Sequence, residues 1–321
     1  MRNVLVTAIG SFSADIVIKN LKKLGFNVIG CDIYPKEWIV DSYNVSSFYR
    51  VPYATNESEY IKFIYDICKK ENINFIFPLT DIEVDIFNKN RNLFEDEQIK
   101  VCISLETTIE LCRDKLKIAR FLSRKNICNT IKTQLLTEIN IDEIYFPVVC
   151  KPYNGRSSQG LKYINSVEEL EDFIKSSDIS NYIIQPFISG DIITVDIIRQ
   201  SKTNQTVAIC RKELLRTQNG AGTSVYVFSD KHLERDAINI ANELDINGCV
   251  NFEFIEDSSG SMHFIECNPR FSGGVEFSCI AGYDCVSNHI KCFTNKEIDN
   301  KFSIKNQYIC RKYEEYVTSI D

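Results

Sequence analysis

Residues 251–274 read NFEFIEDSSGSMHFIECNPRFSGG, and this stretch decides the fold. Apolar and polar side chains alternate on both sides of the turn SSGS, which predicts a β-hairpin. A four-residue turn would pair Ile255 with Phe264. It would also place Glu253 opposite Glu266, with their Cβ atoms about 5 Å apart. Two carboxylates at that spacing repel each other, and a hard divalent cation bound between them removes the conflict.

The return strand of this hairpin continues the same polar face. Side chains in a strand alternate with a period of two, so Asn268 and Arg270 lie on the face of Glu266. The hairpin therefore predicts a cluster of oxygen ligands from Glu253, Glu266 and Asn268, with an arginine at its rim. The alternative is a solvated polar strand face, which the apolar neighbours and the following NPRFSGG disfavour.

A second candidate site is the lysine that ends an apolar strand at 146–151. Lys151 precedes the loop NGRSSQG at 154–160, which is rich in glycine and hydroxyl residues. Backbone N–H groups of such a loop suit phosphate oxygens, and the lysine supplies a point charge. The glycine spacing is similar to a P-loop, but Leu-Lys follows instead of Lys-Ser or Lys-Thr, so a P-loop is excluded. An exposed β-hairpin loop is the alternative.

A third candidate is the segment YIIQPFISGD at 182–191. A strand interrupted by Pro186 predicts a hinge between two parts of the chain, because proline cannot donate to a ladder. The freed backbone N–H and C=O groups of such a hinge suit the edge of an adenine ring. A plain linker is the alternative.

The first third of the chain alternates short apolar strands with amphipathic helices. Strands are expected at 3–7, 27–32 and 75–78, and helices at 13–24 and 58–70. Strands separated by helices pair in parallel, which predicts a doubly wound sheet with ligands beyond the strand ends. Asp32 could hold a ribose hydroxyl there, but the first turn has one glycine and no GxGxxG. An NAD-dependent dehydrogenase is therefore a weaker alternative. Residues 107–125 are predicted to form one helix, and β-rich alternation dominates from residue 191 onward.

Length and composition limit the function classes. The chain has 321 residues and a net charge of −7, which at roughly 150 residues per domain indicates two or three domains. The negative field disfavours a nucleic-acid partner. No stretch approaches the roughly 20 apolar residues of a membrane span, and we expect no signal peptide. The 13 cysteines include no CxxC pair, so we expect a reducing cytoplasm and no zinc ribbon.

Together these motifs resemble the ATP-grasp superfamily, in the branch of the carbamoyl phosphate synthase large subunit. The resemblance covers nearly the whole chain. FIECNPRFSGG at 264–274 is similar to the ExNxR metal-binding strand of that branch, and VVCKP at 148–152 to its second nucleotide-binding lysine strand. RDK at 113–115 is similar to its Asp-Lys helix, and FPLTDIE at 77–83 to the end of its preceding domain.

The resemblance implies an α/β (α+β) chain with an ATP-grasp fold in three parts. Residues 1–106 would form a Rossmann-like, doubly wound pre-ATP-grasp domain. Residues 107–187 would form the small lid subdomain, and residues 188–321 the large β-rich subdomain that carries the metal site.

The resemblance also implies roles for individual residues. ATP would be bound by two lysines, a mobile loop and the hinge: Lys115, Lys151, Ser157, Ser158, Gly160, Gln185, Phe187 and Ile188. Glu253, Glu266 and Asn268 would hold Mg²⁺, and Mn²⁺ would also suit them. The catalytic cations would be Arg270, Lys151 and Arg211. The family usually has Gly-x-Glu after the hinge, with the glutamate on ribose. Here Ile192 stands at that place, so Asp191 replaces the glutamate or the ribose is held less tightly.

The activity implied is ATP-dependent ligation of a small carboxylate to an amine through an acyl phosphate, with release of ADP and phosphate. We expect no nucleic-acid and no membrane partner, and a homodimer is compatible with this activity. A non-catalytic ATP-binding regulator of the same fold is the second alternative, beside the dehydrogenase.

Overall fold

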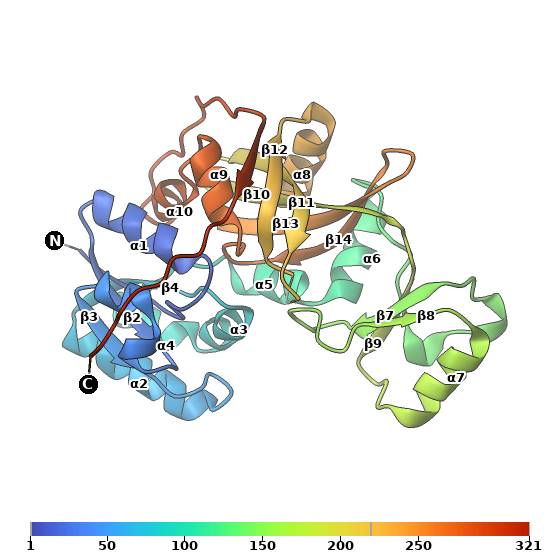
Figure 1. The fold of residues 1–321 in the computed structure, drawn as a ribbon, viewed down its shortest axis with the longest axis horizontal. Coiled ribbons are helices and arrows are strands. Elements are labelled where there is room, and N and C mark those ends of the chain that lie inside the picture. The colour runs from blue at the N-terminus through green and yellow to red at the C-terminus, as the bar shows by residue number, and fades with distance from the viewer. Residues whose placement is uncertain (1, 219, 321) are drawn as a thin grey trace.

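The computed structural model of the chain describes residues 2–218 and 220–320. The strands form sheets of five, six and four strands, with helices packed against them (Figure 1). The five-stranded sheet is parallel, and the other two are antiparallel. This is the mixed α/β architecture expected from the sequence.

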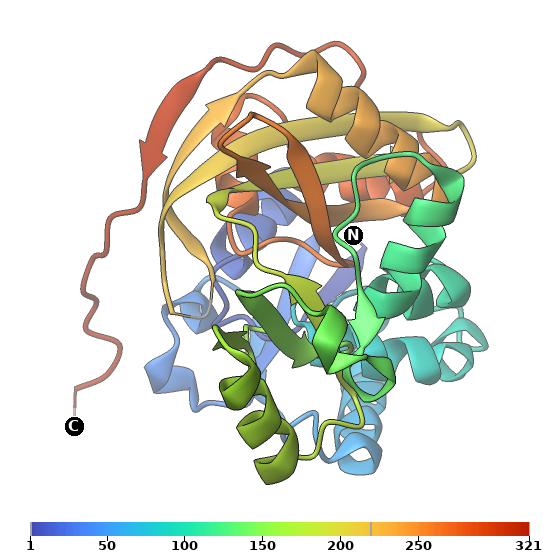
Figure 2. The ribbon, with the colours of Figure 1, turned by 90° about the vertical axis from the view of Figure 1, so that its right-hand side faces the viewer.

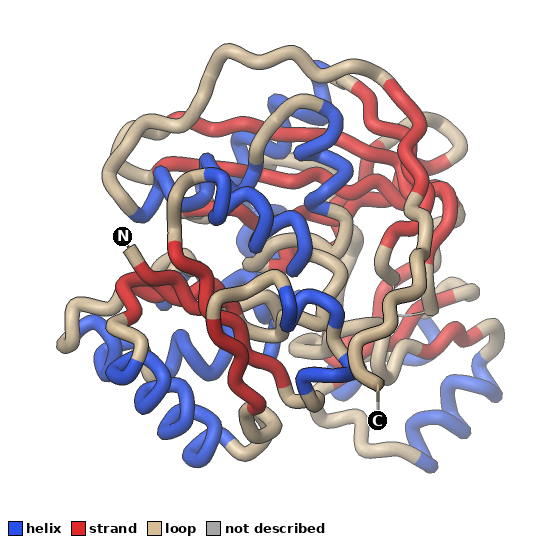
Figure 3. The backbone as a smooth tube through the Cα atoms, turned by 60° about the vertical axis from the view of Figure 1, so that its left-hand side comes forward, coloured by secondary structure: helices blue, strands red, loops and turns tan. Residues whose placement is uncertain are grey.

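The first hundred residues build the parallel sheet, in the order β3-β2-β1-β4-β5. Its strands are β1 (Asn3–Val6), β2 (Asn27–Asp32), β3 (Ser47–Arg50), β4 (Ile73–Phe77) and β5 (Lys100–Val101). Val4 and Val6 pack toward α1 (Ala14–Lys23), and Leu5 packs toward α2 (Glu57–Lys70). Figure 3 shows helices on both sides of these strands. The predicted parallel sheet is therefore confirmed.

The single helix predicted at 107–125 is wrong. The structure has two helices there, α5 (Glu106–Arg113) and α6 (Lys115–Lys125), separated by Asp114. Asp114 is extended, with φ −110° and ψ 103°, and its carboxylate accepts hydrogen bonds from the N–H groups of Leu116 and Lys117. An aspartate in that position caps the first turn of a new helix, so one apolar stripe runs across a boundary that periodicity does not reveal.

The four-stranded sheet follows α6 and has the order β6-β9-β7-β8. Its strands are β6 (Gln134–Leu135), β7 (Val148–Pro152), β8 (Lys162–Ile164) and β9 (Tyr182–Pro186), with α7 (Val167–Ser176) against them. Leu170 and Phe173 of α7 belong to one hydrophobic cluster with Val148, Cys150 and Ile184. This cluster contains no residue of the other two sheets, so among the described residues the small sheet has a core of its own.

The six-stranded sheet has the order β14-β13-β10-β11-β12-β15. Its strands are β10 (Gly190–Gln200), β11 (Gln205–Arg216), β12 (Gly222–Phe228), β13 (Gly248–Asp257), β14 (Met262–Asn268) and β15 (Gln307–Cys310). One face packs on α8 (Lys231–Glu243), and the other on α9 (Val275–Ala281) and α10 (Cys285–Phe293). The second face shares its core with α1 and the parallel sheet, so these two sheets are held by one hydrophobic core.

The hairpin of β13 and β14 pairs Glu253 with Glu266. The register then shifts by one residue at Ile265, so Ile255 lies opposite His263, and the predicted pairing of Ile255 with Phe264 is wrong. The turn between the paired residues 256 and 262 is five residues long, not four. Without the bulge that turn would place residue 252 opposite Glu266, so the bulge keeps the two carboxylates together.

Several short elements were not predicted. Among them are the helices α3 (Asp81–Lys89) and α4 (Arg91–Glu95) and the 3-10 turns η1 (Lys36–Trp38), η2 (Val40–Tyr43), η3 (Leu136–Glu138) and η4 (Ile141–Glu143). The most important is α3, which begins with a capping box of Thr80 and Glu83. This cap fixes Thr80 and Asp81 at the carboxyl end of β4, beside the candidate site.

After β15 the chain runs back along the parallel sheet (Figures 1 and 2). The hydroxyl of Tyr43 donates to the carbonyl of Thr318 at 2.5 Å, and the hydroxyl of Thr318 donates to the carbonyl of Glu37 at 2.5 Å. The C-terminal segment therefore connects the six-stranded sheet with η1 and η2 of the parallel part. Within residues 2–218 and 220–320, no helix has the length and apolar character needed to cross a bilayer.

We expect Asp114→Ala to lower the free energy of unfolding by about 1 kcal/mol, the usual value of a lost helix cap. Asp114→Asn keeps a capping oxygen and is the matched control, so it should unfold close to wild type. Urea denaturation followed by circular dichroism measures both. An equal loss in the two variants would show that the negative charge, and not the cap, stabilises α6.

Candidate functional site

A cavity of about 940 Å³ lies where the three sheets meet. It is lined by the carboxyl ends of the parallel strands, the loop after β7, the hinge after β9 and the β13–β14 hairpin. Most of the predicted site residues line it: Lys115, Lys151, Ser157, Ser158, Gln185, Phe187, Ile188, Arg211, Glu253, Glu266, Asn268 and Arg270. The lining does not include Gly160 or Asp191.

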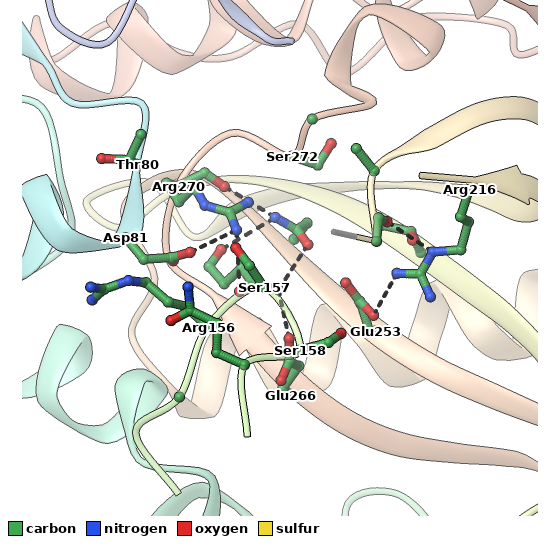
Figure 4. A pocket seen from close by; sticks show the side chains of 18 of the residues that line it. Thr80, Asp81, Arg156, Ser157, Ser158, Arg216, Glu253, Glu266, Arg270 and Ser272 are labelled. Atoms are coloured by element: carbon green, nitrogen blue, oxygen red, sulfur yellow. Dashed lines mark hydrogen bonds and ion pairs between the residues drawn. The ribbon is translucent and has the colours of Figure 1, made fainter. Parts of the chain in front are cut away.

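The centre of the cavity is the facing pair Glu253 and Glu266 (Figure 4). Asn268, two residues further along β14, donates from Nδ2 to Oε1 of Glu266 at 3.1 Å. The side chains of the two glutamates are about one-fifth exposed, 20% for Glu253 and 21% for Glu266. Three oxygen-bearing side chains are therefore presented to the cavity from one strand pair.

Two lysines approach Glu266. The ammonium of Lys115 lies 3.2 Å from Oε2 of Glu266 and donates to the carbonyl of Gly155 at 2.7 Å. Lys115 is the first residue of α6, so the Asp114 cap decides where this ammonium lies. Lys151 enters from β7, and burial lowers the pKa of its ammonium, with Glu266 partly offsetting that effect.

Arg216 was not predicted as a site residue, yet it lines the cavity. Its guanidinium lies 3.3 Å from Oε2 of Glu253 and donates from Nε to the carbonyl of Gly220 at 2.8 Å. Arg216 ends β11, after register shifts between residues 213 and 216. An irregular strand end gives no alternation to follow, so its direction cannot be predicted from the sequence.

The two facing carboxyls differ in their charge balance. Burial opposes ionisation at Glu266, but Lys115 and Lys151 outweigh it and lower the pKa of that carboxyl. At Glu253, burial and the negative charge of Glu266 raise the pKa, and Arg216 offsets this only in part. Glu253 is therefore the member of the pair that lacks sufficient positive charge.

This donor set fits a hard divalent cation. No group of three or more His, Cys, Asp or Glu side chains that could hold a metal occurs in the described part of the chain, so the candidate set is two carboxylates and the amide of Asn268. A cation between Glu253 and Glu266 would relieve the repulsion that raises the Glu253 pKa. Mg²⁺ and Mn²⁺ prefer such oxygen ligands. The assignment of the three residues to a metal stays a prediction.

Arg270 connects the hairpin to the parallel sheet. Its guanidinium donates to Oδ2 of Asp81, at the start of α3, at 2.8 Å. Burial opposes ionisation of Asp81, but Arg270 and Arg113 outweigh it and lower the pKa of that carboxyl. Figure 4 shows Asp81 and Arg270 pointing toward each other, joined by this hydrogen bond. Arg270 is thereby held at the rim of the cluster.

The loop after β7 contains unusual backbone conformations. Ser157 and Ser158 have positive φ values of 50° and 56°, and Gly160 has 74°. A Cβ at Gly160 would lie 2.7 Å from the hydroxyl of Tyr182, so only glycine fits there. Ser157 and Ser158 line the cavity, whereas the position of Gly160 indicates a role in shaping the loop.

The segment after β9 lies along the same cavity. Gln185 is buried and donates from Nε2 to the hydroxyl of Thr133 at 2.8 Å. Phe187 and Ile188 line the cavity beyond Pro186, where the strand ends. The hinge residues are therefore brought to the same cavity as the lysines and the hairpin.

Comparisons with known proteins show what two parts of this chain are similar to. Residues 178–316 match a family model described as an ATP-grasp in the biosynthetic pathway with Ter operon. Residues 4–102 match a model described as a PylC-like N-terminal domain. The chain contains an ATP-grasp domain. The resemblance stated from the sequence motifs is confirmed.

Two curated proteins to which this chain is similar are carbamoyl phosphate synthase large chains. That of Saccharolobus islandicus (strain M.14.25 / Kamchatka #1) is 22% identical over 249 residues, which is 72% of this chain and 23% of that protein. That of Clostridium beijerinckii is 26% identical over 287 residues, which is 84% of this chain and 26% of that protein. The chain thus spans about a quarter of the length of these relatives.

Solved structures share the fold. Biotin carboxylase from Campylobacter jejuni superposes with a TM-score of 0.79 at 18% identity, covering 95% of this chain and 74% of that one. An L-amino acid ligase from Bacillus licheniformis has a TM-score of 0.67 at 14% identity, covering 86% of this chain and 68% of that one. N5-carboxyaminoimidazole ribonucleotide synthetase from Thermotoga maritima has a TM-score of 0.69 at 17% identity, covering 93% of this chain and 77% of that one.

Asp191, predicted as a site residue, has other surroundings. Asp191 points away from the cavity, and its carboxylate pairs with Lys212 at 2.5 Å. Alternation along β10 turns its neighbour Ile192 inward instead, so the structure does not bring Asp191 to the lining of the cavity. Lys212, which alternates with Arg211 on β11, also contacts Glu256 at 3.5 Å and adds no charge to the cavity.

Arg211, predicted as a catalytic cation, is 1% exposed and bound to carboxylates on two sides. It pairs with Asp196, and its Nε donates to Oε1 of Glu213 at 3.0 Å. Burial opposes its positive charge, but Asp196 and Glu213 outweigh burial and raise the pKa of the guanidinium. Its Nη2 donates to the hydroxyl of Ser272 at 2.9 Å. With its charge balanced by these carboxylates, Arg211 is placed to orient the Ser272 loop, and its catalytic role stays a prediction.

We expect Glu253→Gln to raise the melting temperature in the absence of divalent cations, because it removes a carboxylate whose pKa is raised by burial and by Glu266. A raised carboxyl pKa means that ionisation destabilises the fold above that pKa. This cost disappears as the pH falls toward 4.5, the ordinary value. The advantage of the variant should therefore be largest at neutral pH and shrink on acidification.

Scanning calorimetry between pH 8 and about pH 4.5 measures this difference. Glu256→Gln is the control on the same strand, since Glu256 pairs with Lys212 outside the cavity, and it should show no such gain. A Glu253→Gln protein that is less stable than wild type at neutral pH would contradict the interpretation.

Proposed function

We propose that the protein is an ATP-dependent carboxylate–amine ligase that forms an acyl phosphate and releases ADP and phosphate. The observation that carries this proposal is the convergence of Lys115, Lys151 and Arg270 on the facing pair Glu253 and Glu266 in one cavity. Cations and paired carboxylates at one point suit the transfer of a γ-phosphoryl group, where charge develops on the outer phosphate oxygens.

In this proposal the nucleotide lies between the four-stranded and the six-stranded sheet. Lys115 and Lys151 bind the phosphates, and the loop with Ser157 and Ser158 donates hydrogen bonds over them. The hinge of Gln185, Phe187 and Ile188 accommodates the adenine, because a concave and partly apolar wall suits a flat ring. With Ile192 where the family has a glutamate, we expect the ribose to be bound more weakly.

Glu253, Glu266 and Asn268 would hold Mg²⁺, or Mn²⁺, which neutralises phosphate charge when bound. Arg270 then faces the transferred group from the side of the parallel sheet, and its pairing with Asp81 keeps the guanidinium oriented. The substrate carboxylate attacks the γ-phosphorus, ADP leaves, and the amine then attacks the acyl carbon with loss of phosphate. The chain contributes positioning and charge instead of a covalent nucleophile.

The names of the similar proteins support an ATP-dependent ligase without defining the bond formed. They include a carbamoyl phosphate synthase, a biotin carboxylase and an L-amino acid ligase. The proposal includes the formation of an amide bond. It also includes a homodimer, a cytoplasmic setting and a division of the chain into three parts, at residues 1–106, 107–187 and 188–321. The substrates would be small molecules.

We expect ADP and phosphate, and not AMP and pyrophosphate, as products. Incubation with ATP–Mg²⁺, hydroxylamine and a panel of amino acids and small carboxylates should give a hydroxamate together with an equal amount of ADP, because hydroxylamine traps an acyl phosphate. Chromatography and mass spectrometry measure both. AMP as the main product would overturn the mechanism, and ATP binding without turnover on any carboxylate would favour a non-catalytic regulator.

Arg270→Lys keeps the positive charge but loses the planar fork that meets Asp81 and a phosphoryl group together. We expect the turnover number to fall about 10²-fold, with the dissociation constant of ATP–Mg²⁺ changed much less. Isothermal titration and the ADP assay give the two values. Lys117→Arg, an exposed position on α6 whose side chain is 68% accessible, is the control and should leave both unchanged.

A further inference from the structure

One wall of the cavity is built from three segments that are far apart in the sequence. They are the turn before α1 with Phe12, the β11–β12 turn with Ala221, and the loop Ser272–Gly274 after the hairpin. A Cβ on Gly273 would lie 3.3 Å from Cβ of Ala221 and 3.8 Å from Cβ of Phe12. The three segments therefore meet at Gly273, and we call them the acceptor wall.

Arg311, the residue after β15, contacts two segments of the acceptor wall through its side chain and is anchored beside the third through its backbone. Its backbone N–H donates to the carbonyl of Thr223 at 2.8 Å, which anchors it beside the Ala221 turn. Its guanidinium donates to the carbonyl of Gly273 and, from Nη1, to the carbonyl of Phe12 at 3.4 Å. The same guanidinium lies 5.0 Å from the ring centroid of Phe12 and 5.0 Å from that of Phe277.

The surroundings of Arg311 are unusual for a structural arginine. Burial lowers the pKa of its guanidinium, and its Nε is buried with no hydrogen-bond partner among the described residues. Arg311 is half-buried, and a guanidinium withdrawn from water is normally paired with a carboxylate. Here two backbone carbonyls and two aromatic faces take that place, and all but Phe277 belong to the acceptor wall.

A second arginine fixes the wall from the opposite side. Arg211 donates to the hydroxyl of Ser272 and is itself held by Asp196 and Glu213. A Cβ on Gly274 would lie 3.0 Å from Nη2 of Arg211, so the loop follows the guanidinium closely. Arg211 thus fixes one end of the loop within the six-stranded sheet, whereas Arg311 joins its middle to the turn before α1.

We propose that Arg311 is a positioning residue that holds the acceptor wall together, so that the wall orients the substrate carboxylate against the γ-phosphate. This inference rests on the proposed ligase function. The predicted nucleotide contacts come from α6, β7, the loop after β7 and the hinge, and none of the contacts of Arg311 reaches them. A loosened wall should therefore weaken the use of the carboxylate while ATP binding stays as it was, since a misplacement of about 1 Å costs as much as 10²-fold in rate.

The first measurement needs no substrate. Hydrogen–deuterium exchange of the free protein should show faster exchange in Arg311→Ala than in wild type at residues 10–13, 220–223 and 272–275. Arg311→Lys keeps the charge without the planar fork and should lie between the two. The control is Lys312→Ala, because Lys312 is 81% exposed and pairs with Glu314 at 2.8 Å; it should match wild type.

The second measurement uses ATP–Mg²⁺ and hydroxylamine with each carboxylate of the panel. Arg311→Ala should raise the KM for the carboxylate about tenfold, with partial recovery in Arg311→Lys, and change the dissociation constant of ATP–Mg²⁺ less than about twofold. Unchanged exchange in the three segments, or an equal loss of carboxylate use and ATP affinity, would overturn the inference. If wild type forms no hydroxamate, the proposed function fails, and the exchange data alone decide whether Arg311 holds the wall. Should Arg311→Ala fail to fold, Arg311→Lys decides by the same criteria.

Discussion

The mutual repulsion of Glu253 and Glu266 is the constraint around which the cavity is organised. The two carboxyls are set opposite each other by a strand register that depends on one bulge. Each then has a cation from a different part of the chain, Arg216 from the end of β11 and Lys115 from the start of α6. The balance is unequal, as the raised pKa of Glu253 and the lowered pKa of Glu266 indicate. A site that stores unbalanced negative charge is prepared for a further cation.

The same need for balanced charge connects the parts of the molecule. Arg270, which follows the hairpin, forms an ion pair with Asp81 at the end of the parallel sheet, and Arg113 lies 3.7 Å from the same carboxylate. Asp81 is held there by the α3 capping box, and Lys115 by the Asp114 cap. Helix caps are local interactions of about 1 kcal/mol each, yet here they determine where charged groups from separate parts of the chain meet.

Sequence reasoning succeeded where one periodicity governs one element. The alternation of β13 and β14 predicts the facing glutamates, and the strand–helix alternation predicts the parallel sheet. It was wrong where a single residue overrides the pattern, as Asp114 does within 107–125 and the bulge at Ile265 does within the hairpin. Asp191 and Arg211 show a different limit, because a family motif identifies a position but the direction of the side chain follows from its partners. Asp191 pairs with Lys212. Arg211 pairs with Asp196 and Glu213.

The separate hydrophobic core of the four-stranded sheet has a consequence for motion. The parallel and the six-stranded sheets cannot part without exposing apolar side chains to water, because one cluster runs through both. The small sheet closes its own cluster with α7, so moving it relative to the other two sheets would expose few apolar side chains. Two sheets that share one core are expected to unfold as one cooperative unit, whereas a sheet with a separate core can move or unfold locally on a faster timescale. Nucleotide entry and product exit would then depend on the connections of the small sheet, while the acidic pair lies in the part that shares one core.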